Sequence, residues 1–260
     1  MIEPYTIVTA SNDNQMLSDN LLKSKAISSA TDVIVQKGYQ SASKAYNDAI
    51  EKSKTDLIIF THQDIYLPPN WCSELYKSIS ILDVNSSKWG VLGVWGVSTS
   101  GIHTGFMYCN AFGDKMGQSF ESPKEVQTLD EVVLVIRKSS GLRFDNNLHG
   151  FHLYGSDLCL TADSMSLKNY VVSAFCVHNS TNYHAFPRDF WSSYKYLRKK
   201  WIKKTPIHAS CTTITKSMKP MITSIIERNI RRIIKGGAQK PRIRDPKSFY
   251  SDVLETQAND

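Results

Sequence analysis

The chain has 260 residues, of which 41% are hydrophobic and 21% charged, and its formal net charge is +7; these proportions are typical of a soluble globular protein with a substantial core. No apolar run approaches the roughly 18 residues of a membrane span, the first residues lack a secretory signal, and the five scattered cysteines contain no CxxC pair. We therefore expect a cytoplasmic protein with reduced cysteines and neither disulfides nor a structural zinc site.

Predicted strands and helices alternate along the amino-terminal part of the chain. Short apolar runs bounded by turn residues predict strands, and apolar residues at helical spacing predict helices. The expected strands are residues 5–10, 32–36, 56–60, 89–98 and 131–138, and the expected helices are residues 18–27, 41–54 and 70–82. Ser18 is the expected N-cap of the first helix. This order predicts an α/β fold with a doubly wound, mostly parallel sheet.

Polar side chains follow the third predicted strand directly. His62, Gln63 and Asp64 come after the apolar run that ends at Phe60 and Thr61, and before two prolines. One explanation is a solvated loop, since polar residues commonly end strands. The other is a binding site, because open α/β sheets bind ligands at the carboxyl ends of their strands. A carboxylate there suits a divalent cation that bridges phosphate oxygens.

Five stretches in order resemble a known enzyme family. They are "IVTASNDNQMLSDNLLKS", "SASKAYNDAI", "DLIIFTHQDIYLPPNW", "LDEVVLVIRKSSGLRFDNNLHGFHLYGSDLCL" and "VVSAFCVHNS". Together they resemble a GT-A glycosyltransferase of the bacterial family-2-like branch in which HQD replaces Asp-x-Asp. The resemblance covers residues 4–180 and implies a GT-A-type, Rossmann-like fold that binds a nucleotide-sugar donor.

The resemblance implies which residues hold the donor. The loop after the first strand would cradle the nucleoside, although Ser and Asn there also suit an ordinary turn. Gln36 and Lys37 stand where relatives often have a base-binding acid, which leaves the nucleotide base open. The residues implied in donor binding are Thr9, Ala10, Ser11, Asn12, His62 and Gln63.

A metal site is also implied by the resemblance. Asp64 matches the surviving acid of Asp-x-Asp, and His178 matches a histidine that relatives bring back to the metal. The expected cofactor is Mn²⁺ or Mg²⁺; imidazole suits Mn²⁺, whereas Mg²⁺ prefers oxygen ligands. His62 stands where relatives have an acid, so it either weakens the metal site or contacts phosphate.

Asp157 is the expected catalytic base. It matches the acid that, in the family, precedes an apolar helix and takes the proton of the acceptor hydroxyl. Alternatively, Asp157 stabilises the first turn of that helix through the helix dipole. Asp130 and Glu131 lie near the acceptor or form a solvated strand start. Expected acceptor contacts, or else core aromatic residues, are Trp95, His152 and Tyr154.

The C-terminal part of the chain differs sharply in charge. Residues 1–187 carry 14 Lys and Arg against 18 Asp and Glu, whereas residues 188–248 carry 17 against 3. We therefore divide the chain into a GT-A-like catalytic domain, residues 1–187, and a basic helical appendage, residues 188–260.

Residues 188–204 and 221–237 of this appendage have the pattern of basic amphipathic helices. Their apolar positions at helical spacing are Phe190, Tyr194, Leu197, Trp201, Ile222, Ile226, Ile230 and Ile233. Such helices suit an anionic membrane surface, with Trp191 and Trp201 at headgroup depth. The apolar faces could instead pack on the body, and nucleic-acid binding is the third explanation. We favour peripheral docking at the inner face of the membrane and expect no nucleic acid.

These observations predict a metal-dependent glycosyltransferase of the hexosyltransferase type. It would move a sugar from a nucleotide-sugar to a glycan or lipid-linked acceptor in cell-surface polysaccharide synthesis. Inversion at the anomeric carbon follows from assigning Asp157 as base rather than nucleophile. The alternative is a non-catalytic module of the same fold that binds a sugar-nucleotide or a glycan. The donor sugar, the linkage and the oligomeric state stay open.

Overall fold

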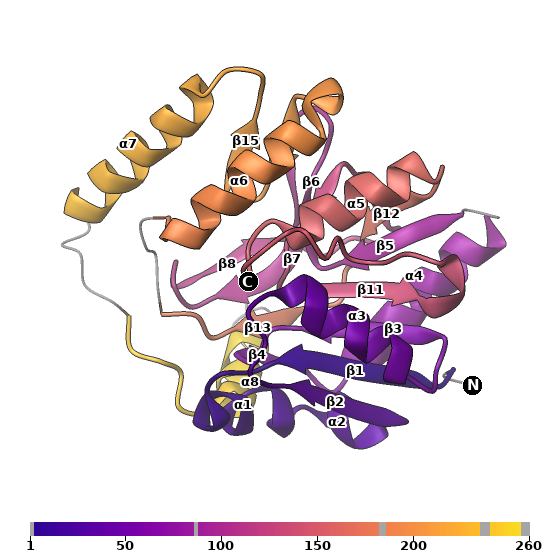
Figure 1. Cartoon of the computed structure of the whole chain (residues 1–260). Coiled ribbons are helices and arrows are strands. Elements are labelled where there is room, and N and C mark those ends of the chain that lie inside the picture. Colours follow the sequence, from indigo (N-terminus) through magenta and orange to yellow (C-terminus); the bar gives the residue numbers. More distant parts are fainter. Residues whose placement is uncertain (1–2, 86–87, 182–185, 235–239, 256–260) are drawn as a thin grey trace.

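A seven-stranded sheet forms the centre of the protein (Figure 1). The computed structural model describes residues 3–85, 88–181, 186–234 and 240–255. The strand order is β2-β1-β3-β11-β5-β12-β9, and all strands except β11 and β9 are parallel. The strands are β1 (Tyr5–Ala10), β2 (Asp32–Gln36), β3 (Leu57–Thr61), β5 (Trp89–Gly93), β9 (Lys124–Val126), β11 (Val133–Arg137) and β12 (Lys168–Val171). The predicted mostly parallel α/β sheet is confirmed.

Helices cover both faces of this sheet because its strands are apolar on both sides. In β3, Ile58 and Phe60 join one hydrophobic core, and Leu57 and Ile59 join the other. The first core contains α3 and α5 and the second α1 and α4, so that in Figure 1 α3 lies in front of the sheet and α4 behind it. The helices are α1 (Asn14–Asp19), α2 (Lys25–Ser29), α3 (Ala42–Lys52), α4 (Trp71–Val84) and α5 (Tyr154–Ser164).

A second, six-stranded sheet adjoins the first and carries part of the site. The predicted strand at residues 89–98 supplies both sheets, since it divides at Val94 into β5 and β6. Gly93 and Gly96 permit this close packing, because a Cβ on either would lie within 3.0 Å of backbone oxygen in a neighbouring strand. The strands are β4 (Ile65–Tyr66), β6 (Trp95–Val97), β7 (His103–Cys109), β8 (Asp114–Gly117), β10 (Thr128–Leu129) and β13 (Cys176–His178).

The helix predicted at residues 18–27 is wrong. The chain forms α1, a 3₁₀ turn at Leu21–Lys23, and α2 instead, with a break at Asn20 where φ is −120° and ψ is −85°. The Asn20 side-chain amide donates to the carbonyl of Met16, and its oxygen accepts from Asn179. Asp13, not Ser18, is the N-cap, since its carboxylate accepts from the Met16 N–H. Side chain–backbone bonds of this kind compete with helix continuation.

The first core continues across Pro187 into the basic segment. Phe190, Tyr194 and Leu197 of α6 are buried in the core that also contains α3 and α5. Residue 187 therefore marks a change in charge rather than a gap in packing, and packing on the body accounts for the apolar face of α6. The elements of this segment are α6 (Arg188–Lys200), a 3₁₀ turn at Ile202–Lys204, β14 (Ile207–Ala209), β15 (Thr212–Ile214), α7 (Lys219–Ile234) and α8 (Pro246–Glu255).

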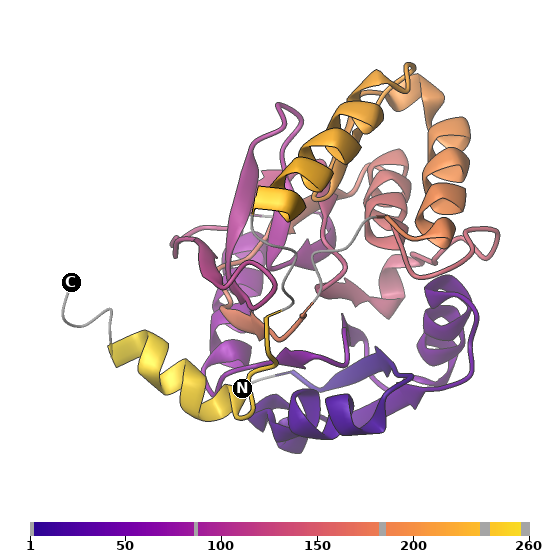
Figure 2. The same ribbon diagram turned by 90° about the vertical axis from the view of Figure 1, so that its left-hand side faces the viewer.

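The second basic helix, α7, differs from α6. Its Ile222, Ile226 and Ile230 side chains are 52%, 54% and 50% exposed, and Figures 1 and 2 both place α7 at the periphery of the molecule. Ile233 lies outside the described side chains. None of the described helices is both long enough and apolar enough to cross a bilayer.

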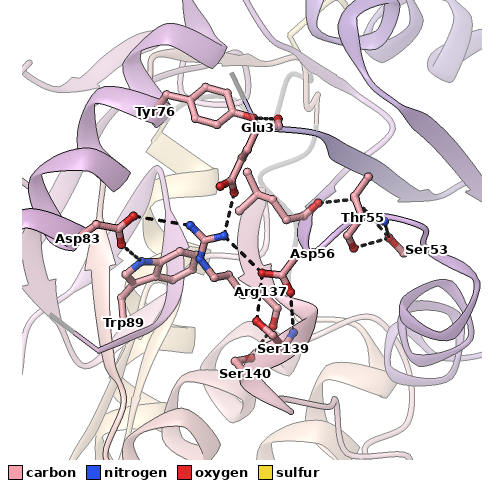
Figure 3. Close-up of polar contacts among 11 residues, drawn as sticks. Glu3, Ser53, Thr55, Asp56, Tyr76, Asp83, Trp89, Arg137, Ser139 and Ser140 are labelled. Carbon is pink, nitrogen blue, oxygen red and sulfur yellow. Dashed lines mark hydrogen bonds and ion pairs between the residues drawn. The ribbon is translucent and has the colours of Figure 1, made fainter. Parts of the chain in front are cut away.

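A charged cluster stabilises the end of the sheet where β1, β3 and β5 begin (Figure 3). The polar loops that follow β1 and β3 lie at the opposite end. Arg137, the last residue of β11, lies 2.9 Å from Glu3, 3.4 Å from Asp56 and 3.7 Å from Asp83, measured from guanidinium nitrogen to carboxylate oxygen. The guanidinium also lies over the Trp89 ring. The cluster joins the starts of β1, β3 and β5 to the antiparallel β11.

Candidate functional site

The main pocket lies where β1 and β3 end. Its volume is about 460 Å³, within the size range of small-molecule sites. Its walls come from the loops after β1, β2 and β3 and from the starts of α3 and α5. The lining residues are Ala10, Ser11, Asn12, Gln36, Gly38, Tyr39, Tyr46, His62, Gln63, Asp64, Phe151 and Tyr154. The structure thus brings five of the six predicted donor-binding residues together.

Gln63 joins the two loops that form this pocket. Its side-chain oxygen accepts from the Ser11 hydroxyl at 2.7 Å and from the N–H groups of Asn12 and Asp13 at 3.1 Å. Its amide nitrogen donates to the Asn12 side chain at 2.7 Å. The side chains of Ser11, Asn12 and Gln63 therefore hold one another, so that the loop after β1 is fixed before any ligand arrives.

His62, Asp64 and His178 form a cluster with the geometry of a metal site. One ligand atom from each lies within 4.8 Å of the others. His178 ends β13, which pairs with β4 directly after Asp64 and so places His178 opposite Ile65. Two imidazoles and a carboxylate at this spacing fit a first-row divalent cation. His62, predicted as a donor contact, therefore stands with the two predicted metal ligands.

The ionisation of the cluster follows from its burial and charges. Although burial opposes it, the charge of His178 holds the pKa of Asp64 at about 2. The Nε2 atom of His178 lies 3.5 Å from an Asp64 oxygen, and this carboxylate raises the pKa of His178 well above its usual value against the effect of burial. Burial lowers the pKa of His62, which keeps that imidazole neutral, and its Nε2 lies 3.1 Å from the Tyr154 hydroxyl.

A second, more polar pocket of about 600 Å³ adjoins the cluster. It shares Asn12, Gln63 and Asp64 with the main pocket. Its other lining residues are Asp13, Asn14, Met16, Asn179, Ser180, Thr181 and Arg242. A ligand bound at the cluster would therefore have an aromatic pocket on one side and an amide-rich pocket on the other.

Asp157 lies apart from both pockets. Its carboxylate is buried, accepts from Lys200 at 2.9 Å and from the Trp201 indole N–H at 2.6 Å, and joins α5 to the end of α6. Burial raises its pKa even though Lys200 and Trp201 oppose that shift. An acceptor hydroxyl can reach Asp157 only if Lys200 and Trp201 withdraw.

The remaining predicted residues take different positions. Thr9 is fully buried within β1 and does not line the pocket. Trp95, 8% exposed, packs in the second core because β6 turns its ring inward over β7. His152 lies 3.4 Å from the Asp189 carboxylate and beside the Phe190 ring. Tyr154 does line the pocket, where it contacts His62.

Glu131 is a carboxylate that the antiparallel course of β11 brings near the end of β3, although it lines neither pocket. Val133 pairs with Thr61, and the His62 N–H donates to the carbonyl of Val132, so that Glu131 lies near the end of β3. Its carboxylate accepts from the Gly155 N–H at 3.3 Å, and a Cβ at residue 155 would lie 3.2 Å from its Cγ. Burial of the carboxyl raises the pKa of Glu131 to about 8, although the residue as a whole is only partly buried. The sequence shows this acid pair directly before an apolar strand. It does not show that the strand runs antiparallel to β3, which is what places Glu131 near the end of β3.

Several solved structures resemble most of this chain at low sequence identity. A TarS chain from S. aureus in complex with UDP-GlcNAc has a TM-score of 0.48 at 12% identity, covering 88% of this chain and 72% of that one. GalNAc-T7 with UDP, GalNAc and Mn²⁺ has a TM-score of 0.49 at 9% identity, covering 88% and 55%. Another TarS structure matches over 43% of its own length.

Sequence similarity identifies the family of this chain. A Fuscovulum blasticum protein named "ATP synthase subunits region ORF 6" is 25% identical over an alignment of 183 positions that covers 65% of this chain and 69% of that one. The model of the family described as "Glycosyltransferase like family" matches residues 6–219, which include both pockets except Arg242. Since this match spans most of the chain, the protein belongs to that glycosyltransferase-like family.

Proposed function

We propose that this protein is a metal-dependent, inverting glycosyltransferase that moves a sugar from a nucleotide-sugar to a glycan or lipid-linked acceptor in cell-surface polysaccharide synthesis. The observation that carries the proposal is the His62, Asp64 and His178 cluster at the end of β3, beside a pocket of about 460 Å³, in a chain of this family.

The main pocket suits the nucleoside of the donor. Tyr39 and Phe151 offer aromatic faces for a base, and the loop of Ser11 and Asn12 offers polar atoms for a ribose. Because Gln63 already holds this loop, little conformational entropy is lost when the donor binds. The sugar diphosphate would then extend toward Asp64.

The ligand set favours Mn²⁺ over Mg²⁺. Two imidazoles suit a transition metal, whereas Mg²⁺ prefers oxygen ligands and water. A divalent cation held by His62, Asp64 and His178 would offset the charge of the departing diphosphate.

In the proposed reaction, the oxygen of an acceptor hydroxyl forms a bond to the anomeric carbon. The bond from that carbon to the diphosphate breaks, and the diphosphate leaves with the electron pair. The hydroxyl proton passes to a carboxylate of the protein. Glu131 suits this step better than Asp157, because the residue is only partly buried at the start of α5 and its pKa of about 8 lies near neutral pH. The carboxylate of Asp157, by contrast, is paired on both sides.

Binding of nucleoside diphosphates tests the proposal. UDP, GDP, CDP and dTDP are titrated calorimetrically into the wild type and Asp64→Asn, with and without Mn²⁺. At least one should bind in a Mn²⁺-dependent manner, and Asp64→Asn should weaken that binding by more than about tenfold. Asp32→Asn, which changes a carboxylate at the start of β2, is the matched control. Absence of binding by all four to the wild type would refute the proposal.

Hydrolysis distinguishes the enzyme from a binding module of the same fold. The wild type is incubated with the sugar form of the nucleotide that binds, and release of free nucleoside diphosphate is measured. Slow Mn²⁺-dependent release that Asp64→Asn abolishes supports catalysis. Tight binding without any release, and without transfer to added acceptors, would leave a binding module.

We further propose that α7 docks the protein on an anionic membrane surface. Ile222, Ile226 and Ile230 form a row of half-exposed apolar side chains, and the helix sequence holds four Lys and Arg against the single acid Glu227. This composition suits the headgroup region of a bilayer. Because α6 packs on the body, the docking surface is confined to α7 and does not include Trp191 or Trp201.

A further inference from the structure

The two pockets of the site have very few positive side chains to receive a diphosphate. Among the described residues that line them, Arg242 is the sole Lys or Arg. It comes from the C-terminal segment after α7, far from the rest of the site in sequence. A donor diphosphate at the metal cluster would carry negative charges that the carboxylate of Asp64 cannot receive.

The segment that carries Arg242, which we call the strap (residues 240–245), is fixed to the body on both sides of this residue. The Asn110 side chain donates to the Pro241 carbonyl at 2.9 Å. The Asn179 side-chain amide donates to the Ile243 carbonyl at 2.9 Å and accepts from the Ile243 N–H at 2.8 Å. Arg242 thus projects from a short stretch of backbone held by two asparagines.

One of these asparagines belongs to the metal cluster's own framework. Asn179 is 1% exposed, follows His178 directly, and its N–H donates to the Asp64 carbonyl at 2.9 Å. The strap and the two candidate ligands therefore share one hydrogen-bonded support. A buried, fully paired amide of this kind positions its partners closely.

Beyond the strap, α8 anchors the chain end to the body. The Phe249 and Tyr108 rings lie 4.6 Å apart, and the buried Tyr250 donates to the Asn70 side chain. Figure 1 shows the strap descending beside the sheets to α8, next to β4 and α1. The strap is therefore held at its far end as well as beside the pocket.

The Arg242 side chain itself is not locked. The side chain is 53% exposed, and the ion pair between its guanidinium and Asp13 is long, 3.5 Å. A guanidinium binds phosphate oxygens through paired, charge-assisted hydrogen bonds, which are stronger than one long carboxylate contact. We propose that Arg242 binds the diphosphate of the nucleotide-sugar donor, which makes the C-terminal strap part of the donor site. This inference rests on the proposed function.

Binding of Mn²⁺ with inorganic pyrophosphate tests the inference independently of the nucleotide base. Calorimetry compares the wild type with Arg242→Ala, with Arg244→Ala as a matched exposed control on the same strap, and with Asp13→Asn. Arg242→Ala should weaken pyrophosphate binding by about 10- to 100-fold, while its affinity for Mn²⁺ alone stays unchanged. Arg244→Ala should stay within about twofold of the wild type.

Asp13→Asn separates a ligand role from a structural ion pair. Asparagine still caps α1, and the loss of the carboxylate frees Arg242, so pyrophosphate should bind as tightly as before or more tightly. If Asp13→Asn weakens binding as much as Arg242→Ala does, or if Arg242→Ala binds like the wild type, the inference is wrong. Failure of the wild type to bind Mn²⁺-pyrophosphate would overturn the inference, whereas the proposed function fails only if none of the four nucleoside diphosphates binds.

Discussion

The substitution Asp157→Asn distinguishes a structural carboxylate from a catalytic one. The structure predicts that Asp157 serves mainly to hold α6 on α5, because its carboxylate is buried and bonded to Lys200 and Trp201. Asparagine keeps the shape and one acceptor oxygen for the indole N–H, but it removes the charge that faces Lys200.

The loss in the free energy of unfolding depends on which partners Lys200 keeps in the variant. Removing one partner of a buried ion pair costs about 3–5 kcal/mol when the other charge is left unpaired. Lys200 is not left unpaired, since its ammonium group also lies 2.7 Å from Asp145. Burial also raises the pKa of Asp157, so its two partners do not fully offset the desolvation of the carboxylate. We therefore expect a loss of about 1–3 kcal/mol in the free energy of unfolding.

Thermal unfolding and transfer rates, measured on the same preparations, test this expectation. A loss near the middle of that range lowers Tm by about 4–8 °C in a chain of this size. The folded variant should keep its transfer rate within a few-fold of the wild type. Asp163→Asn is the matched control on α5, because its pair with Lys204 is half exposed and its loss should cost less than about 1 kcal/mol.

The opposite pattern would refute this reasoning. If Asp157→Asn keeps the stability of the wild type and loses transfer by about 10²- to 10⁴-fold, Asp157 is the base. In that case α6 must move away from α5 before the acceptor can bind.

Four further expectations concern other parts of the molecule. Glu131→Gln should slow transfer by about 10²- to 10⁴-fold. Because a base acts in its ionised form, the wild-type transfer rate should rise with pH through about 8, and this rise should be absent from the pH–rate profile of the variant. Mn²⁺ affinity should rise as pH rises, since the cation must displace the proton that Asp64 keeps on His178. Calorimetry in buffers of different ionisation enthalpy should record this proton release, and an affinity that does not change with pH would contradict the expectation. Ile226→Asp in α7 should reduce co-sedimentation with phosphatidylglycerol vesicles at low salt, whereas equal binding to neutral vesicles would exclude an electrostatic contribution. Arg137→Met should lower the free energy of unfolding by about 1 kcal/mol, allowing for the partial exposure of its partners, and leave Mn²⁺ affinity unchanged in the same titration.

The local features of this protein could be read from its sequence. The continuous apolar run of β3 and the polar residues after it predict a buried strand that ends in a site, and this prediction needs only the local sequence. The amphipathic character of α6 and α7 is also predicted by local sequence, from the spacing of their apolar residues. Even here, a single side chain overrode the pattern, since Asn20 interrupts a predicted helix and bonds to the Met16 carbonyl and to Asn179.

Long-range packing decided the rest, because a sequence pattern specifies which face is buried but not what covers it. β11 could have been parallel or antiparallel, and only the antiparallel course sets Glu131 beside the end of β3. The amphipathic pattern of α6 suits a lipid surface and a protein core equally well. In the structure α6 packs on the core, and this packing brings Lys200 and Trp201 to Asp157. Arg242 reaches the site because Asn110 and Asn179 fix the strap there, and Asn179 lies 64 positions from Ile243, which it holds.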